Sequence, residues 1–189
     1  MTERELLADC LKRLNSAGIS YMVTGSMASN FWGIPRTTHD LDFVIQLPPR
    51  AIPQMVAAFA SDFFIDEQAI RAAYAYPYQF NAIDQRSSLK VDFWLPANLP
   101  FEREMFRRRV AQTLFNVPAW IATAEDIILH KLYWDKSTPS ERQRNDVAGV
   151  FKVQAANLDR AYLSHWAAEL GVEASLQLLF DGKLKPKST

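Results

Sequence analysis

Two short segments decide the fold: Val23-Thr24-Gly25-Ser26 and, after thirteen intervening residues, Asp40-Leu41-Asp42-Phe43. The apolar run 19–24 predicts a strand that ends just before Gly25, and residues 27–32 predict a short helix after it. A second strand is predicted over 41–46, with Asp40 and Asp42 at its start. Residues two apart in a strand project to the same face, so we expect both carboxylates at one end of this strand.

The residue types in these segments indicate a particular chemistry. Two neighbouring carboxylates repel each other unless a cation lies between them, and ligand sets made only of oxygen suit Mg²⁺ or Mn²⁺. Gly25 lacks the Cβ that would prevent close backbone approach. Ser26 lies at a predicted helix N-terminus, where free N–H groups favour an anion. The pattern therefore predicts a site for a metal-bound nucleotide.

A third carboxylate strengthens this prediction. Residues 89–95 predict a strand in which Asp92 lies on the face opposite Val91 and Phe93. The segment 78–83 also alternates as a strand and is expected to pair with 89–95 as a hairpin. We expect the carboxylates of Asp40, Asp42 and Asp92 to converge and to hold two ions about 3.5–4 Å apart, as in two-metal phosphoryl-transfer sites.

A glycine-serine pair, a gap of about a dozen residues, Asp-x-Asp on a strand and a later strand aspartate together resemble a known family. It is the nucleotidyltransferase superfamily related to DNA polymerase β. The stretch Gly33-Ile34-Pro35-Arg36-Thr37-Thr38-His39-Asp40-Leu41-Asp42 is similar to small bacterial members, including the abortive-infection toxin-type enzymes. The resemblance covers roughly residues 15–165 and departs from the family at Thr24, where an apolar residue is usual.

The resemblance implies an α+β fold with a small mixed twisted β-sheet, flanking helices and a C-terminal helical bundle. We expect a nucleotidyltransferase-like core over 1–122 and a helical part, packed on that core, over 123–189. In the family, one helix reads Ala-Glu-Asp, then four variable residues, then Lys-Leu. The lysine of this helix faces the triphosphate. Here Ala124-Glu125-Asp126 precedes Lys131-Leu132, which predicts a phosphate contact for Lys131.

Three further residues enter the expected site. Arg36 and Thr37 lie in the loop before Asp40 and could contact the nucleotide, although threonines there could equally bond the turn backbone. Asp146 matches a family aspartate that orients the lysine or an arginine. The alternative interpretation is that Asp146 is an ordinary solvated acid on a helix. His39 is expected to be exposed or structural, because it points away from Asp40 on the strand.

The resemblance implies a Mg²⁺- or Mn²⁺-dependent nucleotidyltransferase that moves an NMP group from an NTP to an acceptor. Asp40, Asp42 and Asp92 would hold the metals, and Asp92 would also take the acceptor proton. Gly25 and Ser26 would seat the phosphates, and Lys131 would neutralise the departing pyrophosphate. The acceptor stays open among RNA or tRNA, protein and small molecules. The abortive-infection likeness adds the hypothesis of a toxin with an antitoxin partner or a role in phage defence.

Two alternatives belong to other classes. One is a non-catalytic nucleotide-binding or regulatory module, such as an antitoxin partner, on the same fold; three clustered carboxylates would have no physical purpose there. The other is a glycosyltransferase with an Asp-x-Asp motif. Such enzymes need a sugar-nucleotide domain before the motif, and only 39 residues precede Asp40.

Composition sets further limits. The formal net charge of zero disfavours broad coating of nucleic acid, although Arg103, Arg107, Arg108 and Arg109 on a predicted helix form either a basic ridge or a solvated face. The only cysteine, Cys10, lies on an apolar helical stripe and predicts a buried small hydrophobe in a reducing compartment. No apolar run approaches the ~20 residues that span a bilayer, so a cytoplasmic protein without membrane contact is expected.

Overall fold

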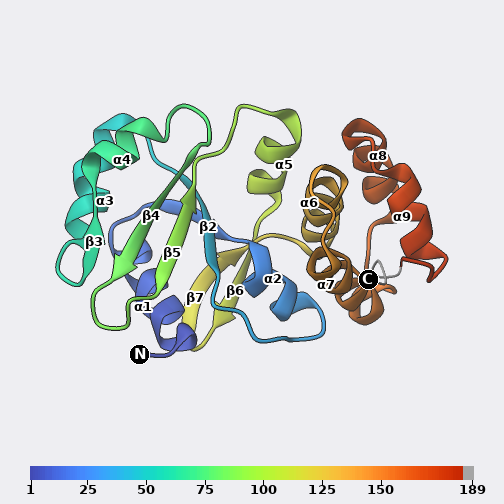
Figure 1. Cartoon of the computed structure of the whole chain (residues 1–189), viewed down its shortest axis with the longest axis horizontal. Helices are drawn as coiled ribbons and strands as arrows, with labels where there is room; N and C mark the ends of the chain where they lie inside the picture. Colours follow the sequence, from blue (N-terminus) through green and yellow to red (C-terminus); the bar gives the residue numbers. More distant parts are fainter. Residues whose placement is uncertain (185–189) are drawn as a thin grey trace. The chain divides into compact units, whose positions relative to one another are not determined.

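The computed structural model describes residues 1–184, and in this part of the chain seven strands form one mixed sheet (Figure 1). Their order across the sheet is β3-β4-β5-β2-β1-β7-β6. The pairs β2–β5 and β1–β7 are parallel, and the other pairs are antiparallel. The strands are β1 (Ser20–Val23), β2 (Leu41–Gln46), β3 (Phe63–Ile65), β4 (Gln79–Asp84), β5 (Lys90–Trp94), β6 (Val110–Leu114) and β7 (Val117–Ile121).

Helices connect and follow these strands. They are α1 (Glu3–Ser16), α2 (Gly25–Trp32), the short 3-10 helix η1 (Pro49–Ala51), α3 (Ile52–Phe59), α4 (Glu67–Ala72), α5 (Pro100–Arg108), α6 (Ala124–Ser137), α7 (Glu141–Gln154), α8 (Arg160–Leu170) and α9 (Glu173–Phe180). Threonine begins two of them in the expected way: Thr2 forms a capping box with Glu5, and the Thr123 side chain accepts from the backbone of Asp126. None of the helices in residues 1–184 has the length and apolarity that a membrane span requires.

The chain divides into two compact units. The first contains Met1–Met27 and Thr38–Ala122, and the second contains Ala28–Thr37 and the chain from Thr123 onward. The sequence-based division after residue 122 assigns residues 28–37 to the first part, whereas the structure groups them with the helices. A close approach explains this grouping: a Cβ on Gly33 would lie 2.7 Å from the backbone nitrogen of Val150 on α7.

One face of the first unit's sheet is packed against α1 and α3. The ring of Phe93 on β5 stacks on Phe43 of β2 at 5.6 Å and meets the edge of Phe59 of α3 at 5.4 Å. Cys10 of α1 is buried in this layer, and burial raises the pKa of its thiol. Burial of these aromatic and aliphatic side chains supplies the main favourable term for this layer.

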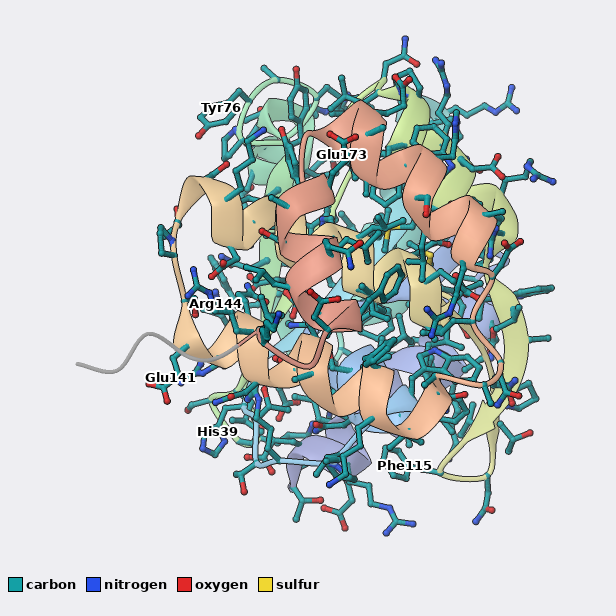
Figure 2. All side chains as sticks on the ribbon, turned by 90° about the vertical axis from the view of Figure 1, so that its right-hand side faces the viewer. His39, Tyr76, Phe115, Glu141, Arg144 and Glu173 are labelled. Carbon is teal, nitrogen blue, oxygen red and sulfur yellow. The ribbon has the colours of Figure 1, made fainter. Side chains whose placement is uncertain are left out.

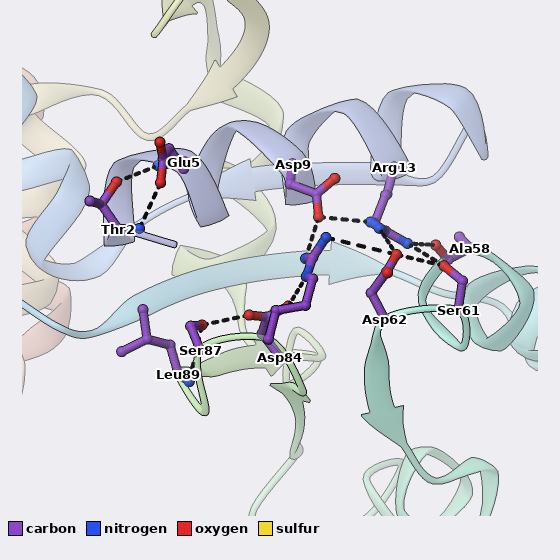
Figure 3. Close-up of polar contacts among 11 residues, drawn as sticks. Thr2, Glu5, Asp9, Arg13, Ala58, Ser61, Asp62, Asp84, Ser87 and Leu89 are labelled. Atoms are coloured by element: carbon purple, nitrogen blue, oxygen red, sulfur yellow. Dashed lines mark hydrogen bonds and ion pairs between the residues drawn. The ribbon is translucent and has the colours of Figure 1, made fainter.

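A charged network holds α1 to β3 and β4 at the edge of this layer (Figure 3). Arg86 donates to Asp84 at 2.6 Å and to Asp9 at 2.7 Å. Arg13 donates to Asp9 at 3.1 Å and also to Asp62. Asp84 is fully buried, and Ser87 binds its second oxygen at 2.5 Å. Each buried carboxylate oxygen of Asp84 therefore has a donor.

Side-chain hydrogen bonds also connect the helices of the second unit to one another. Asp135 near the end of α6 accepts from the backbone of Ser140 at 2.7 Å and from Arg144 at 2.8 Å, which fixes the start of α7. Figure 2 labels Glu141 and Arg144 in the first turn of α7. Tyr162 of α8 donates to Asp126 of α6 at 2.6 Å. These bonds align the helices through their polar sides, while residues such as Val147, Val150 and Leu163 pack between them.

The predicted fold class is confirmed: the chain has a mixed β-sheet with helices and a C-terminal helical part. The predicted strands at 19–24, 41–46 and 89–95 are β1, β2 and β5, and 78–83 pairs with β5 as the expected hairpin. The short strand β3 and the strand β6 escaped prediction. Phe64 of β3 is 61% exposed because only alternate residues of this strand face the helices.

Candidate functional site

Gly25 begins α2 in a conformation that only glycine adopts easily. Its φ is +60°, in the left-handed region. A Cβ at this position would overlap the carboxylate of Asp42 and lie 2.8 Å from its Cγ. The backbone of Thr24 also donates to the carbonyl of Asp42 at 3.0 Å. The turn and the β2 carboxylate are thus held in direct contact.

Asp42 and Asp92 are neighbours on the sheet. The register of the parallel pair β2–β5 places them directly opposite each other, so their side chains share a face. Trp94, two residues along β5, directs its indole N–H toward Asp42 Oδ1 at 3.4 Å. The opposite face of the same strands carries Phe43 and Phe93. This alternation separates the acidic pair from the apolar core.

Asp92 combines burial with an unused oxygen. Its residue is 8% exposed, and Oδ2 forms an ion pair with Lys90 at 2.8 Å. Its Oδ1 is buried and has no hydrogen-bond partner among residues 1–184. A buried carboxylate oxygen without a donor is costly unless a ligand supplies the missing interaction. A bound cation is one ligand that would satisfy this atom.

The expected convergence of three carboxylates is not found. In the described part of the chain, no group of three or more His, Cys, Asp or Glu side chains is arranged to hold a metal ion. The physical reason lies at Asp40. Strand β2 begins at Leu41, so Asp40 precedes the hydrogen-bonded ladder, is exposed, and is not held on the face of Asp42 by strand geometry. The structure therefore pairs Asp42 with Asp92 and leaves Asp40 at the rim.

The residues of the first unit nevertheless fit a hard divalent cation. Asp42 and Asp92 supply carboxylate oxygens, the donor type that Mg²⁺ and Mn²⁺ prefer. One of these oxygens is buried and lacks a donor. The side chain of Ser26, the second residue of α2, adds a hydroxyl at the N-terminus of that helix.

The second unit contains a cluster in which two basic side chains surround one carboxylate, Asp146. Arg36 donates two hydrogen bonds to Asp146 of α7, from Nε to Oδ1 at 2.7 Å and from Nη2 to Oδ2 at 2.8 Å. Lys131 of α6 lies 2.9 Å from Asp146 Oδ2. Lys131 and Asp146 are almost fully buried, at 5% and 6% exposure. One carboxylate thus positions two cations, so Asp146 is not a solvated helix acid.

Neighbouring side chains fix this cluster further. Asn30 donates to the carbonyl of Arg36 at 2.7 Å and accepts from its N–H at 3.0 Å. Gln143 accepts from Lys131 Nζ at 2.9 Å. Burial opposes the charged form of Asp146, but the hydrogen bond from Arg36 and the charge of Lys131 outweigh it and lower the pKa of that carboxyl. Asp146 is therefore ionised at neutral pH.

The loop residues before β2 have local roles. The carbonyl of Thr37 accepts from Arg36 Nη1 at 3.1 Å, and Thr37 is exposed. The hydroxyl of Thr38 accepts from the backbone N–H of Asp40 at 3.2 Å, which is the turn bonding expected of threonine. His39 is exposed and pairs with Glu3, in agreement with the prediction that it is exposed or structural.

A cavity of the first unit lies away from the acidic pair. It has a volume of about 430 Å³ and is lined by Gln46, Leu47, Tyr74, Leu95, Asn98 and Arg103 among others. These residues stand at or beyond the carboxyl ends of β2 and β5, whereas Asp42 is the second residue of β2. Cavity size alone would therefore miss the site that strand register and burial identify.

Comparisons with solved structures find the same fold. An antigenic nucleotidyltransferase-like protein from Paracoccidioides brasiliensis has a TM-score of 0.56 and 15% identity, over 98% of this chain and 94% of that chain. A solution structure of the antibiotic-resistance factor ANT(2'')-Ia has a TM-score of 0.58 and 13% identity, over 95% and 97%. ANT(2'')-Ia in complex with adenylyl-2''-tobramycin has a TM-score of 0.60 and 12% identity, over 92% and 99%.

The chain has the nucleotidyltransferase fold. The match extends over both units and over nearly the whole length of each similar chain. No family model matches the sequence, and no curated protein sequence does. At identities of 12–15% the likeness concerns the fold. The assignment of residues on this nucleotidyltransferase fold therefore rests on the geometry described above.

Sequence reasoning missed three residues beside these clusters: Lys90, Trp94 and Gln143. A signal existed for each. Lys90 and Trp94 flank Asp92 at a spacing of two on a predicted strand, so they had to share its face. Gln143 precedes Asp146 by three residues on a predicted helix, which puts both on one side.

Proposed function

We propose that this protein is a divalent-metal-dependent nucleotidyltransferase that transfers an NMP group from an NTP to an acceptor hydroxyl. The observation that carries the proposal is the acidic pair: Asp42 lies against Gly25, and beside it Asp92 keeps one buried oxygen without a donor. The nucleotidyltransferase fold supports the same chemistry. So does the ANT(2'')-Ia complex, whose ligand is a nucleotidylated small molecule.

Asp42 and Asp92 would hold the ion, and among the described residues no third acidic side chain is grouped with them. A bound Mg²⁺ or Mn²⁺ would supply charge neutralisation at the phosphate oxygens. Gly25 and Ser26 would seat the phosphates at the start of α2, where the backbone can approach closely and free N–H groups favour anions. The chain's part is therefore positioning and electrostatics.

The proposed step balances as a displacement at the α-phosphorus. The acceptor oxygen forms a bond to that phosphorus, and the bond from it to the oxygen bridging to the β-phosphate breaks. Pyrophosphate leaves with the electron pair of the broken bond. The acceptor proton passes to the Asp92 carboxylate and on to solvent.

We assign the cations of the second unit to the phosphates. Lys131 would neutralise charge on the departing pyrophosphate, and Arg36 and Thr37 would contact the nucleotide. Asp146 would orient both cations, as its bonds to Arg36 and Lys131 support. The preorganised ammonium of Lys131 would then be worth most as negative charge builds in the transition state.

The test supplies the full chain with each α-labelled NTP, Mg²⁺ or Mn²⁺, and three acceptors: total RNA, cell protein and tobramycin. We expect a labelled acceptor and an equal amount of pyrophosphate. Nucleotide binding without pyrophosphate release, with every NTP and acceptor, would instead favour a nucleotide-binding module. A toxin role, an antitoxin partner and a cytoplasmic location stay predictions from the sequence.

A further inference from the structure

One row of side chains crosses three strands at the acidic pair. Asn81 of β4 lies directly opposite Asp92 of β5, and Asp92 lies directly opposite Asp42 of β2. Directly opposed residues share a face of the sheet. Gly25 contacts Asp42 at the other end of this row. The order is therefore glycine turn, Asp42, Asp92 and Asn81, all within the first unit.

The side chain of Asn81 takes no part in holding the fold together. Strand β4 alternates strictly: Phe80, Ala82 and Asp84 are buried, while Asn81 and Ile83 are exposed. Within residues 1–184 the amide of Asn81 has no hydrogen-bond partner. Lys90, which shares this face, is engaged with Asp92 Oδ2. An exposed amide beside a buried carboxylate with an unused oxygen is free to bind a ligand.

The inference rests on the proposed function, because the direction of that reaction determines at which end of the row the acceptor would bind. Pyrophosphate leaves toward the side that seats the phosphates, which is the Gly25 and Ser26 end of the row. In an in-line displacement the attacking oxygen enters from the opposite side of the phosphorus. That side is the Asp92 end, and the next residue beyond Asp92 is Asn81.

We propose that Asn81 hydrogen-bonds the acceptor beside Asp92, and that the acceptor is a small neutral polyhydroxyl compound. A side-chain amide offers both donors and an acceptor, which matches hydroxyl groups. Along β4 this face presents the uncharged side chains of Gln79, Asn81 and Ile83. A polyanion such as RNA would need arginines or lysines at the phosphates.

Three arginines of α4 and α5 are already engaged by groups of their own helices and loops. Arg71 of α4, a helix that packs on β4, donates to Glu67 at 2.6 Å. On α5, Arg107 binds Glu104 at 2.6 Å and Arg103 binds Asn98 at 2.6 Å. Glutamates of the same helices thus neutralise two of these guanidinium groups, and an asparagine side chain hydrogen-bonds the third. This pattern favours the solvated-face interpretation of α5 over a basic ridge.

The test measures how the enzyme divides ATP between two acceptors. The full chain receives α-labelled ATP, Mg²⁺ and myo-inositol, a neutral ring polyol that competes with water. The measured ratio is labelled inositol-AMP to labelled AMP. We expect Asn81→Ala to lower this ratio about five- to tenfold, the loss of one or two hydrogen bonds.

The matched control removes an amide from another strand of the same sheet. Gln112→Ala on β6, which lies at the far end of the strand order, should leave the ratio unchanged. An unchanged ratio in Asn81→Ala would overturn the inference while leaving the proposed function in place. An RNA oligonucleotide that is labelled in preference to the polyol, equally well by Asn81→Ala, would also overturn it.

A binding measurement keeps the two proposals separable. In ¹⁵N spectra of the full chain, the side-chain amide signals of Asn81 are those missing from Asn81→Ala. Adding myo-inositol with Mg²⁺ should shift these signals and not those of Gln112. If the protein consumes no ATP, the proposed function fails, and this titration still decides the inference: absence of a shift at Asn81 would refute it.

Discussion

Two buried carboxylates on neighbouring strands, Asp84 of β4 and Asp92 of β5, have opposite surroundings. Asp84 is fully buried on the helix-packed face, and Arg86 and Ser87 bind both of its oxygens. Asp92 is buried on the other face, and only one of its oxygens has a partner among the described residues. Burial of an acid therefore does not by itself indicate function. The unsatisfied oxygen of Asp92 adds the feature that Asp84 lacks, and it marks the face that we propose as the metal site.

The largest expected effect concerns catalysis at the unsatisfied face. Asp42→Asn keeps the shape of the side chain and an oxygen for the indole N–H of Trp94, so stability should change by less than about 0.5 kcal/mol. Transfer of the NMP group should fall about 10³-fold or more, because a metal-binding charge is lost. Steady-state transfer kinetics and denaturant unfolding check the two parts. A variant that loses stability but retains turnover would place Asp42 with Asp84 as a structural acid.

Lys131 gives the next largest effect. Lys131→Met keeps the buried stem and leaves the Arg36–Asp146 pair intact. Turnover should fall about 10²-fold, while NTP affinity falls much less, because the charge matters most as pyrophosphate departs. Lys131→Arg should restore only part of the rate, since a planar fork does not replace a compact ammonium. Equal losses in affinity and turnover for Lys131→Met would show that the lysine only binds the ground state.

Asp84→Asn should lower the stability of the fold and leave turnover nearly unchanged, the reverse of what we expect for Asp42→Asn. It weakens two charge-assisted hydrogen bonds in the network of Figure 3, so the free energy of unfolding should fall by about 2 kcal/mol. Transfer per folded molecule should stay within about twofold, because Asp84 faces the helices. Denaturant melts and kinetics on the same preparation test this. Loss of turnover without loss of stability would contradict the division between the two faces.

The smallest effect is a pH dependence. Burial opposes ionisation of Asp84, but the bonds from Ser87 and Arg86 prevail and lower the pKa of its carboxyl. A lowered pKa gives stability that is present above the unfolded value of about 3.9 and is lost as the pH falls through the folded value. The stability gap between wild type and Asp84→Asn should therefore shrink from pH 7 to pH 3. A constant gap across this range would disprove the ionised, paired state of Asp84.

Much of the first unit could be predicted from the sequence because its signals are local. Alternation in 41–46 and 89–95 predicted which face Asp42 and Asp92 occupy, and glycine before serine predicted the turn at Gly25. The hairpin of β4 and β5 then determines the neighbour of Asp92. Asn81 could have been found in the same way, by writing the predicted strands in register.

The rest depended on contacts that no local pattern encodes. Arg36 and Asp146 are 110 residues apart in sequence, and only folding brings the two together. The expected cluster at Asp40 was not found although the strand itself was predicted at 41–46, because alternation does not say whether a residue just before the strand keeps the face of Asp42. Strand β3 has three residues and depends on pairing with β4, which leaves too short a pattern to recognise.

Binding of Mn²⁺ tests the central claim most directly, and it needs no acceptor. Free Mn²⁺ is measured by electron paramagnetic resonance while wild type, Asp92→Asn or Asp84→Asn is titrated in the presence of a non-hydrolysable NTP analogue. We expect Asp92→Asn to weaken binding at least about tenfold, and Asp84→Asn to bind as wild type does. Wild-type affinity in Asp92→Asn, or an equal loss in both variants, would contradict the claim that the unsatisfied carboxylate face is the metal site.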